Sequence, residues 1–186
     1  MKPPPIRRFP DFLSQAQADQ WFDHLSQRDW RQYQIQMFGR WVNEPRLIDW
    51  AGPVAYVYSG RTLEPRPMSQ ALMDLTDQVS ACAGIQFNHL LMNYYRNGQD
   101  SMGWHRDDEP ELCPDPTIAS LSLGCARDFQ LRRPGDPTTT LTLGHGELLL
   151  MDPPCQSQWQ HQLPKRALSR VATPRINLTF RRVIST

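Results

Sequence analysis

The sequence predicts an α+β protein, mainly β, in which a double-sheet barrel carries helices packed on one side. Helical periodicity occurs only in the first half of the chain, and many short strand-like runs follow it. The chain also has 17 prolines in 186 residues, which argues against a helical bundle because each proline removes a backbone donor. The strand-like runs are too closely spaced for repeated βαβ crossovers. The length suits one compact domain, residues 1–186.

The first residues, 1–10, form a proline- and arginine-containing lead-in that we expect to be mobile or draped on the surface. A helix is predicted to start after Ser14, which can serve as its N-cap. Ala18, Trp21 and Leu25 then recur at helical spacing.

A second helix is predicted from Met68 to Ala83, with Gly84 as its stop. Between the two helices, residues 30–66 mix aromatic, arginine and turn residues, which indicates short strands and loops. After Gly84 the predicted strands are Asn88–Tyr95, Thr117–Leu123, Phe129–Arg132, Thr138–Leu143, Glu147–Met151 and Arg175–Arg182.

Composition points to a soluble cytosolic protein. Lys and Arg number 20 against 19 Asp and Glu, so net charge indicates no partner. No apolar run approaches the ~20 residues that cross a bilayer, and the N-terminus lacks the apolar stretch of a signal peptide. The cysteines are scattered without metal-ligand spacing, so we expect free thiols; they are Cys82, Cys113, Cys125 and Cys155. A monomer is the default expectation.

The sharpest local motif is the H-x-D pair formed by His105 and Asp107. In extended chain, residues i and i+2 project to the same side, so an imidazole and a carboxylate can converge on one ion. A third ligand should come from farther along, and His161 is well placed just after a strand-like run. Two histidines and one carboxylate form the facial triad of non-haem Fe(II) oxygenases, which leaves coordination positions for cosubstrate and O₂.

A lone histidine is more often a hydrogen-bonded structural residue than a ligand. His24 falls in the first predicted helix, His89 in a strand-like run and His145 in a Gly-His-Gly turn. None of the three has a carboxylate two residues further on, so we interpret them as structural.

A second motif lies near the C-terminus, where Arg175, Asn177, Thr179 and Arg181 alternate with apolar residues and share one strand face. An exposed polar face is the ordinary explanation of such alternation. Arginines opposite an iron triad have another use, because a guanidinium can pair in bidentate fashion with the far carboxylate of a dicarboxylate cosubstrate.

With these two motifs in order, the chain resembles the AlkB-like Fe(II)/2-oxoglutarate-dependent dioxygenases, which carry H-x-D…H followed by R-x-N-x-T-F-R. The N-x-Y of Asn93–Tyr95 lies where the family places cosubstrate contacts. The stretches NYYRNGQDSMGWHRDDE (Asn93–Glu109) and IASLSLGCARDF (Ile118–Phe129) are similar to the nucleic-acid demethylase branch. The resemblance spans roughly residues 35 to 183 and includes every triad and cosubstrate position.

The resemblance implies a double-stranded β-helix, or jelly-roll, with a catalytic barrel over residues 86–183. It implies that Fe(II) is bound by His105, Asp107 and His161, and 2-oxoglutarate by Asn93, Tyr95, Arg175, Asn177 and Arg181. O₂ would be the other cosubstrate. Arg175 would pair with the distal carboxylate of 2-oxoglutarate, and Arg181 would lie near its metal-bound end.

Residues 30–66 resemble the family's nucleotide-recognition lid. Phe38 resembles a finger that enters the base stack, and Tyr58 aligns with the aromatic that stacks on a flipped base. Arg46 belongs to the same substrate-binding set. The alternative is that Phe38 and Tyr58 pack a core.

Asp108 and Glu109 follow the triad carboxylate and would favour a base made cationic by N-methylation. The alternative interpretation is that Asp108 and Glu109 belong to a solvated acidic loop. The chain after His161 has Lys and Arg but no Asp or Glu, as expected for a phosphate-binding groove or for a merely solvated basic surface.

The resemblance therefore implies an oxidative demethylase of N-alkylated bases, of the N1-methyladenine and N3-methylcytosine type, in DNA and with RNA as a second candidate. Fe(II), 2-oxoglutarate and O₂ would be used, and succinate, CO₂ and formaldehyde released. One rival is a 2-oxoglutarate-dependent hydroxylase of a protein or small molecule. The other is a non-catalytic nucleic-acid-binding relative. The sequence leaves open DNA against RNA, single against double strand, and which adduct is preferred.

Overall fold

A computed structural model describes residues 3–37, 39–58 and 60–184. In chain order, the elements before the main run of strands are β1 (Ile6–Phe9), α1 (Gln15–Ser26), β2 (Gln34–Met37), β3 (Arg40–Asn43), β4 (Leu47–Ala51), β5 (Tyr56–Tyr58), β6 (Arg61–Leu63) and α2 (Gln70–Ala83). They are followed by β7 (His89–Tyr95), β8 (Met102–His105), β9 (Ile118–Gly124), β10 (Arg127–Arg132), β11 (Thr139–Leu143), β12 (Leu148–Met151), α3 (Cys155–Gln158), β13 (Gln160–Leu163) and β14 (Arg175–Arg181).

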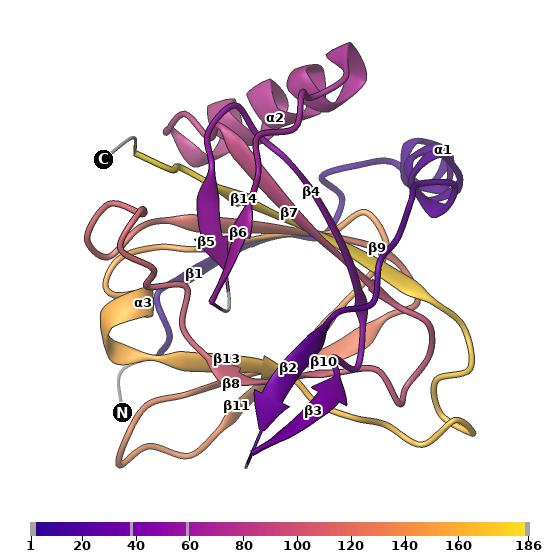
Figure 1. Ribbon diagram of the computed structural model, residues 1–186, viewed down its shortest axis with the longest axis vertical. Coiled ribbons are helices and arrows are strands. Elements are labelled where there is room, and N and C mark those ends of the chain that lie inside the picture. The colour runs from indigo at the N-terminus through magenta and orange to yellow at the C-terminus, as the bar shows by residue number, and fades with distance from the viewer. Residues whose placement is uncertain (1–2, 38, 59, 185–186) are drawn as a thin grey trace.

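Two antiparallel sheets face each other, as Figure 1 shows. The larger sheet has the strand order β1-β12-β9-β14-β7-β4, and the smaller has the order β11-β10-β13-β8. The hairpins β2-β3 and β5-β6 form separate two-stranded sheets, and in Figure 1 they lie at different places beside the opening between the two larger sheets. The mainly β, jelly-roll prediction is thereby confirmed.

The two long helices begin and end where the sequence signals them. Ser14 caps α1, and its side chain and that of Gln17 form a reciprocal capping box. Ser69 caps α2, so this helix begins two positions later than predicted. It ends at Gly84, whose φ of 76° is in the left-handed region that glycine adopts without steric cost.

The core has two layers, one on each side of the larger sheet. Apolar residues of α1 and α2 pack on its outer face, where both helices lie in Figure 1. The second layer fills the space between the sheets and includes Leu91, Leu149, Phe129 and Leu131. Because side chains alternate along a strand, each central strand of the larger sheet contributes to both layers.

Strand β14 shows this alternation most clearly. Ile176, Leu178 and Phe180 belong to the layer under the helices, whereas Arg175 and Arg181 point between the sheets and line the cavity there. All residues of β14 are buried. The ordinary explanation of the polar alternation, an exposed face, is therefore wrong for this strand.

The N-terminal lead-in is more ordered than predicted. Ile6–Phe9 forms an edge strand that pairs antiparallel with Leu148–Met151. Arg8 in this strand also forms an ion pair with Glu147 at 2.6 Å. The segment is too short and too rich in arginine to show a strand pattern, and its partner is distant in the sequence.

The segment 30–66 consists of short strands and loops, as predicted, but it is not structurally separate from the barrel. Its strand β4 pairs with β7 and becomes an edge of the larger sheet. The proposed boundaries of the lid and the catalytic barrel stay predictions. No helix in the described part of the chain is long and apolar enough to span a bilayer.

Candidate metal and cosubstrate site

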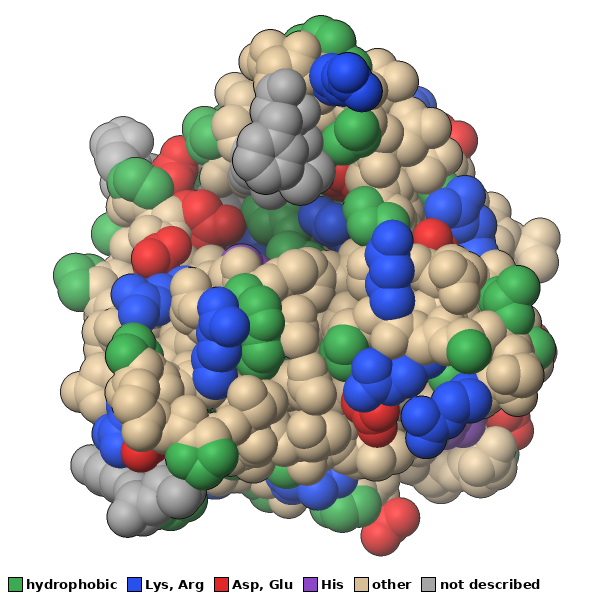
Figure 2. Space-filling model, turned by 90° about the horizontal axis from the view of Figure 1, so that it is seen from below, with side chains coloured by type: hydrophobic (Ala, Val, Ile, Leu, Met, Phe, Trp, Pro, Cys, Tyr) green, Lys and Arg blue, Asp and Glu red, His purple; other side chains and the backbone are tan. Residues whose placement is uncertain are grey.

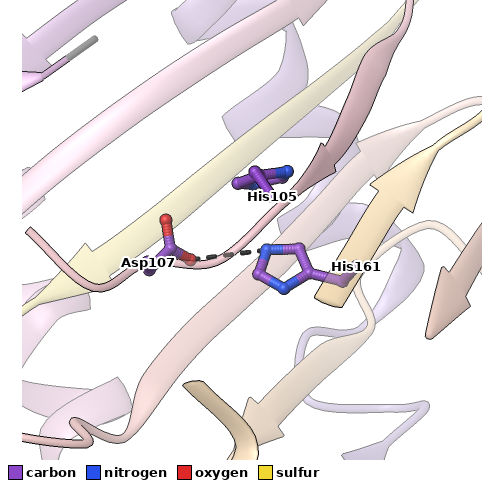
Figure 3. A group of neighbouring side chains, drawn as sticks. All are labelled: His105, Asp107 and His161. Carbon is purple, nitrogen blue, oxygen red and sulfur yellow. Dashed lines mark ion pairs between the residues drawn. The ribbon is translucent and has the colours of Figure 1, made fainter. Parts of the chain in front are cut away.

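The predicted ligands meet at one end of the smaller sheet. His105 is the last residue of β8, and His161 lies in β13 directly opposite it in the antiparallel register. Asp107 lies in the loop just beyond β8, rather than within a strand as the H-x-D argument assumed. The potential ligand atoms of the three side chains all lie within 4.8 Å of one another. Figure 3 shows His161 turned toward the carboxylate of Asp107, with His105 beside them.

Neighbouring groups fix the orientation of these side chains. His105 Nδ1 lies 2.8 Å from the carbonyl oxygen of Gly103, so this nitrogen donates and Nε2 carries the free lone pair. The backbone N–H of Asp107 donates to Gln156 Oε1 at 3.0 Å. His161 Nε2 lies 3.5 Å from Asp107 Oδ2. Arg181 Nη2 donates to the other carboxylate oxygen, Oδ1.

The electrostatics suit metal binding. Burial alone would raise the pKa of Asp107, but Arg181 and the two imidazoles outweigh burial and lower the pKa, so the carboxylate is ionised. Burial lowers the pKa of His105 to about 3, with a further contribution from His161. His105 is therefore neutral, which is the form that ligates a metal. Two imidazole nitrogens and a carboxylate are the donor set expected for Fe(II), so these residues fit that ion.

The candidate cosubstrate residues lie on the two paired central strands β7 and β14. Arg175 is opposite Tyr95, and Asn177 is opposite Asn93. Asn177 Nδ2 donates to Ser120 Oγ at 2.8 Å and to the carbonyl oxygen of Leu121 at 3.0 Å. This wall of the cavity is thus held by hydrogen bonds across the sheet.

Arg175 is a buried cation, only 2% exposed. Its Nη2 donates to Ser122 Oγ at 2.9 Å, and its guanidinium carbon lies 5.6 Å from the centroid of the Tyr95 ring. Among the described residues it forms no ion pair, and its Nε has no hydrogen-bond partner. Burial lowers the pKa of Arg175 to about 10. A buried guanidinium without a carboxylate is costly, so this position fits an anionic ligand.

One cavity joins the two groups. It is open to solvent, and its free space of about 450 Å³ includes part of that solvent. The site candidates that line it are Tyr58, Asn93, Tyr95, His105, Asp107, His161, Arg175, Asn177 and Arg181. Every residue predicted for metal and cosubstrate binding therefore lines the same cavity.

The predicted substrate residues are less uniformly placed. Tyr58 lines the cavity and is only 2% exposed, and its hydroxyl accepts a hydrogen bond from Arg46 at 3.3 Å. Arg46 is buried behind the wall, where its Nε donates to Asn93 Oδ1 at 3.0 Å. Asp108 is exposed and Glu109 is half-buried. Phe38 lies outside the described residues, so its role as a finger stays a prediction.

The other histidines lie apart from the triad. His145 Nδ1 accepts a hydrogen bond from the backbone N–H of Gly124 at 2.7 Å, and its Nε2 lies 3.0 Å from Asp19 Oδ1. His24 is in α1, and His89 is fully buried at the start of β7. These positions agree with a structural interpretation. The cysteines are free thiols, as predicted.

The basic C-terminal segment divides into two sets. Arg175 and Arg181 are buried in the cavity wall, whereas Lys165, Arg170 and Arg182 are exposed. Figure 2 shows a hollowed face of the molecule with Lys and Arg side chains spread around it. The same view shows Asp and Glu side chains beside the hollow, so Lys and Arg are not the only charged groups on this face.

Sequence reasoning missed several supporting residues. Ser120 and Ser122 had a usable signal, because they alternate with apolar residues in TIASLSL and so share a face. Gln156 had none, since α3 was not predicted. Arg127 was also missed; it is 1% exposed, and its Nη2 donates to the carbonyl oxygens of Asp100 and Pro164.

Comparison with known proteins agrees with this geometry. The family model described as "2OG-Fe(II) oxygenase superfamily" matches residues 5–181. The mouse protein named "DNA oxidative demethylase ALKBH2" is 41% identical over 191 residues, covering 94% of this chain and 78% of that protein. The bovine "Alpha-ketoglutarate-dependent dioxygenase alkB homolog 3" is 41% identical over 187 residues, covering 94% of this chain but only 64% of that protein.

A solved structure, titled "The structure of OsALKBH1", superposes with a TM-score of 0.69 and covers 98% of this chain and 100% of that chain. Its sequence identity is 13%, so it supports the fold alone. The predicted enzyme class, a dioxygenase, is confirmed by the family match and the relatives. This chain belongs to the 2OG-Fe(II) oxygenase superfamily.

Proposed function

We propose that this protein is an oxidative demethylase of N-alkylated bases, of the N1-methyladenine and N3-methylcytosine type, in DNA and with RNA as a second substrate. Per turnover, 2-oxoglutarate and O₂ are consumed, and succinate, CO₂, formaldehyde and the unmethylated base are released. The relatives named as a DNA oxidative demethylase and as an alkB homolog support the reaction. The protein would act as a monomer in the cytoplasm.

One observation supports the proposal above the others. A single cavity is lined both by the His105, Asp107 and His161 group and by the buried Arg175, which pairs with no carboxylate in the described part of the chain. A metal site alone would not require a buried cation in the same cavity. A dicarboxylate cosubstrate accounts for both, because one end can bind the metal while the other pairs with the guanidinium.

Each residue would have a separate role. His105, Asp107 and His161 would hold Fe(II), which supplies the activation of O₂ when it is bound. Arg175 would bind the distal carboxylate of 2-oxoglutarate, while Asn93, Tyr95 and Asn177 would orient the cosubstrate by hydrogen bonds. Arg181, which donates to Asp107, would keep that carboxylate ionised and oriented.

The lid would place the methylated base. Tyr58 lies at the cavity wall, where its ring could stack on a base extruded from the strand. Asp108 and Glu109 would be the carboxylates near a cationic base, and Phe38 would fill the gap left in the stack. Arg46 would hold Tyr58 from behind.

The test is a panel of single- and double-stranded DNA and RNA oligonucleotides, each carrying one N1-methyladenine or N3-methylcytosine. Succinate and formaldehyde are measured with Fe(II) and 2-oxoglutarate present, and the repaired base is identified by mass. We expect equal amounts of succinate, formaldehyde and repaired base. Succinate release stimulated by peptides but by none of the oligonucleotides would instead identify a hydroxylase of another substrate.

A further inference from the structure

A buried carboxylate lies behind the substrate side of the cavity. Glu44 follows β3 and is only 1% exposed. Its backbone is fixed on both sides, because its N–H donates to the carbonyl oxygen of Tyr33 at 2.7 Å and its carbonyl accepts from Gln32 Nε2 at 2.9 Å. The backbone at Glu44 is therefore held in place, and its side chain is buried.

Glu44 is linked to the cavity wall through one arginine. Its Oε2 lies 3.5 Å from Arg46 Nη2. The same nitrogen donates to the Tyr58 hydroxyl at 3.3 Å, and Arg46 Nε donates to Asn93 Oδ1 at 3.0 Å. Tyr58 and Asn93 both line the cavity. Two contacts thus separate the carboxylate from the place where a base would stack.

Arg46 remains charged in spite of its burial. Burial disfavours the guanidinium, but Tyr58, Tyr95 and Glu44 outweigh burial and raise the pKa of Arg46. A positive charge therefore lies directly behind Tyr58. Without compensation, it would repel a cationic base stacked on that ring.

The other buried carboxylate of the lid, that of Asp49, already forms two ion pairs. Asp49 is 2% exposed and pairs with both Arg28, at 2.5 Å, and Arg66. Glu44 instead faces one arginine, and its Oε2 has no hydrogen-bond partner among the described residues. The carboxylate of Glu44 therefore acts on Arg46 alone among these arginines, through an ion pair with no close hydrogen bond.

We propose that Glu44 is a specificity-determining residue, which cancels the charge of Arg46 and so lets the cavity favour cationic N-methylated bases over neutral ones. This inference rests on the proposed demethylase function. It places one source of cation preference on the lid, apart from Asp108 and Glu109, which follow the candidate metal ligand. Glu44 acts through Arg46 and Tyr58 and is not proposed to touch the base.

The test compares two bases that differ in charge within one oligonucleotide sequence. N3-methylcytosine is cationic at neutral pH, whereas N3-methylthymine is neutral. The measured quantity is the ratio of kcat/KM for the cationic base to kcat/KM for the neutral base. For Glu44→Gln we expect this ratio to fall about tenfold, the size of effect given by one charge acting over several ångströms in a protein.

Arginine and double variants separate charge from structure. Arg46→Gln removes the positive charge and leaves Glu44 uncompensated, so the ratio should rise. Glu44→Gln combined with Arg46→Gln should return the ratio close to that of the unmodified protein. General damage to the lid would lower kcat/KM for both bases in all three variants. It would not make the ratio fall in one single variant and rise in the other. Glu64→Gln, which removes an exposed carboxylate of the same lid, is the matched control and should leave the ratio unchanged.

A binding measurement gives a second readout that needs no turnover. Fluorescently labelled oligonucleotides carrying either base are titrated with the unmodified protein and with Glu44→Gln. The affinity ratio should fall in the variant. An unchanged ratio in both measurements would overturn the role of Glu44.

If Glu44→Gln does not fold, the Arg46→Gln variant is the test of the proposal. A kcat/KM ratio that fails to rise in that variant contradicts the proposal. Failure of the unmodified protein to demethylate either base would instead refute the proposed function. The ratio of binding affinities would still test the role of Glu44.

Discussion

Replacement of Arg175 by methionine separates a ligand-binding role from a structural one. Arg175 is 2% exposed, and its Nη2 donates to Ser122 Oγ at 2.9 Å. If the distal carboxylate of 2-oxoglutarate pairs with this guanidinium, the variant leaves that carboxylate buried and unpaired. Such a loss costs about 3–5 kcal/mol. At about 1.4 kcal/mol for each factor of ten, the KM for 2-oxoglutarate should rise at least a hundredfold.

Without cosubstrate, the replacement of Arg175 should not destabilise the folded protein. Burial lowers the pKa of Arg175 from its usual value to about 10, so the folded protein disfavours the charge. Each pKa unit corresponds to about 1.4 kcal/mol, and the loss of one hydrogen bond offsets about 1 kcal/mol of the relief. We therefore expect the free energy of unfolding of Arg175→Met, without cosubstrate, to be higher by about 2–3 kcal/mol.

The assay varies 2-oxoglutarate at saturating methylated oligonucleotide and measures succinate, while urea denaturation measures stability. Arg133→Met is the matched control, because Arg133 pairs with Asp136 at 2.6 Å outside the cavity, and its KM for 2-oxoglutarate should not change. The reasoning is refuted if Arg175→Met keeps its KM within threefold, or if it loses several kcal/mol of stability while ligand-free.

Three further predictions concern turnover and stability. Asp107→Ala or His105→Ala should abolish iron-dependent formaldehyde release, and full activity in either variant would remove the triad assignment. Burial lowers the pKa of His89 to about 3, so below pH ~6.5 the unfolded chain binds a proton that the folded protein does not, and stability should fall by up to roughly 4–5 kcal/mol between pH 7 and pH 3. In urea titrations across this range, His89→Leu should show a shallower loss; an equal slope would contradict this cause. Leu178→Ala, at a fully buried position, should lower the free energy of unfolding by about 2–5 kcal/mol in urea, and a loss below 1 kcal/mol would indicate a poorly packed core.

Local patterns predicted much of this fold and site. The capping residue Ser14 and the stop at Gly84 are local signals, and both hold in the structure. The alternation in Arg175–Arg181 predicted which side chains share a face, because the period of a strand is fixed by its backbone. The sequence alone did not determine that this face is buried, since burial depends on the second sheet that covers it.

What the sequence could not predict depends on long-range pairing. The cross-strand register of His161 and His105 joins residues far apart in the chain, and no local period encodes it. The edge strand of Ile6–Phe9 was missed for the same reason. Arg46 was expected to contact substrate, but its position behind Asn93 and Tyr58 follows from the pairing of β4 with β7, which lies outside any local motif.

Anaerobic titration of Fe(II) into the protein, monitored by calorimetry, tests the metal assignment most directly. The protein should bind one Fe(II), and His161→Ala should weaken binding at least about a hundredfold, because even residues that only support a ligand contribute 10–100-fold. The neighbouring variant Gln162→Ala, in the same strand, should bind as the unmodified protein does. Equal affinity of His161→Ala and the unmodified protein would contradict the claim that His161 joins His105 and Asp107 around one ion.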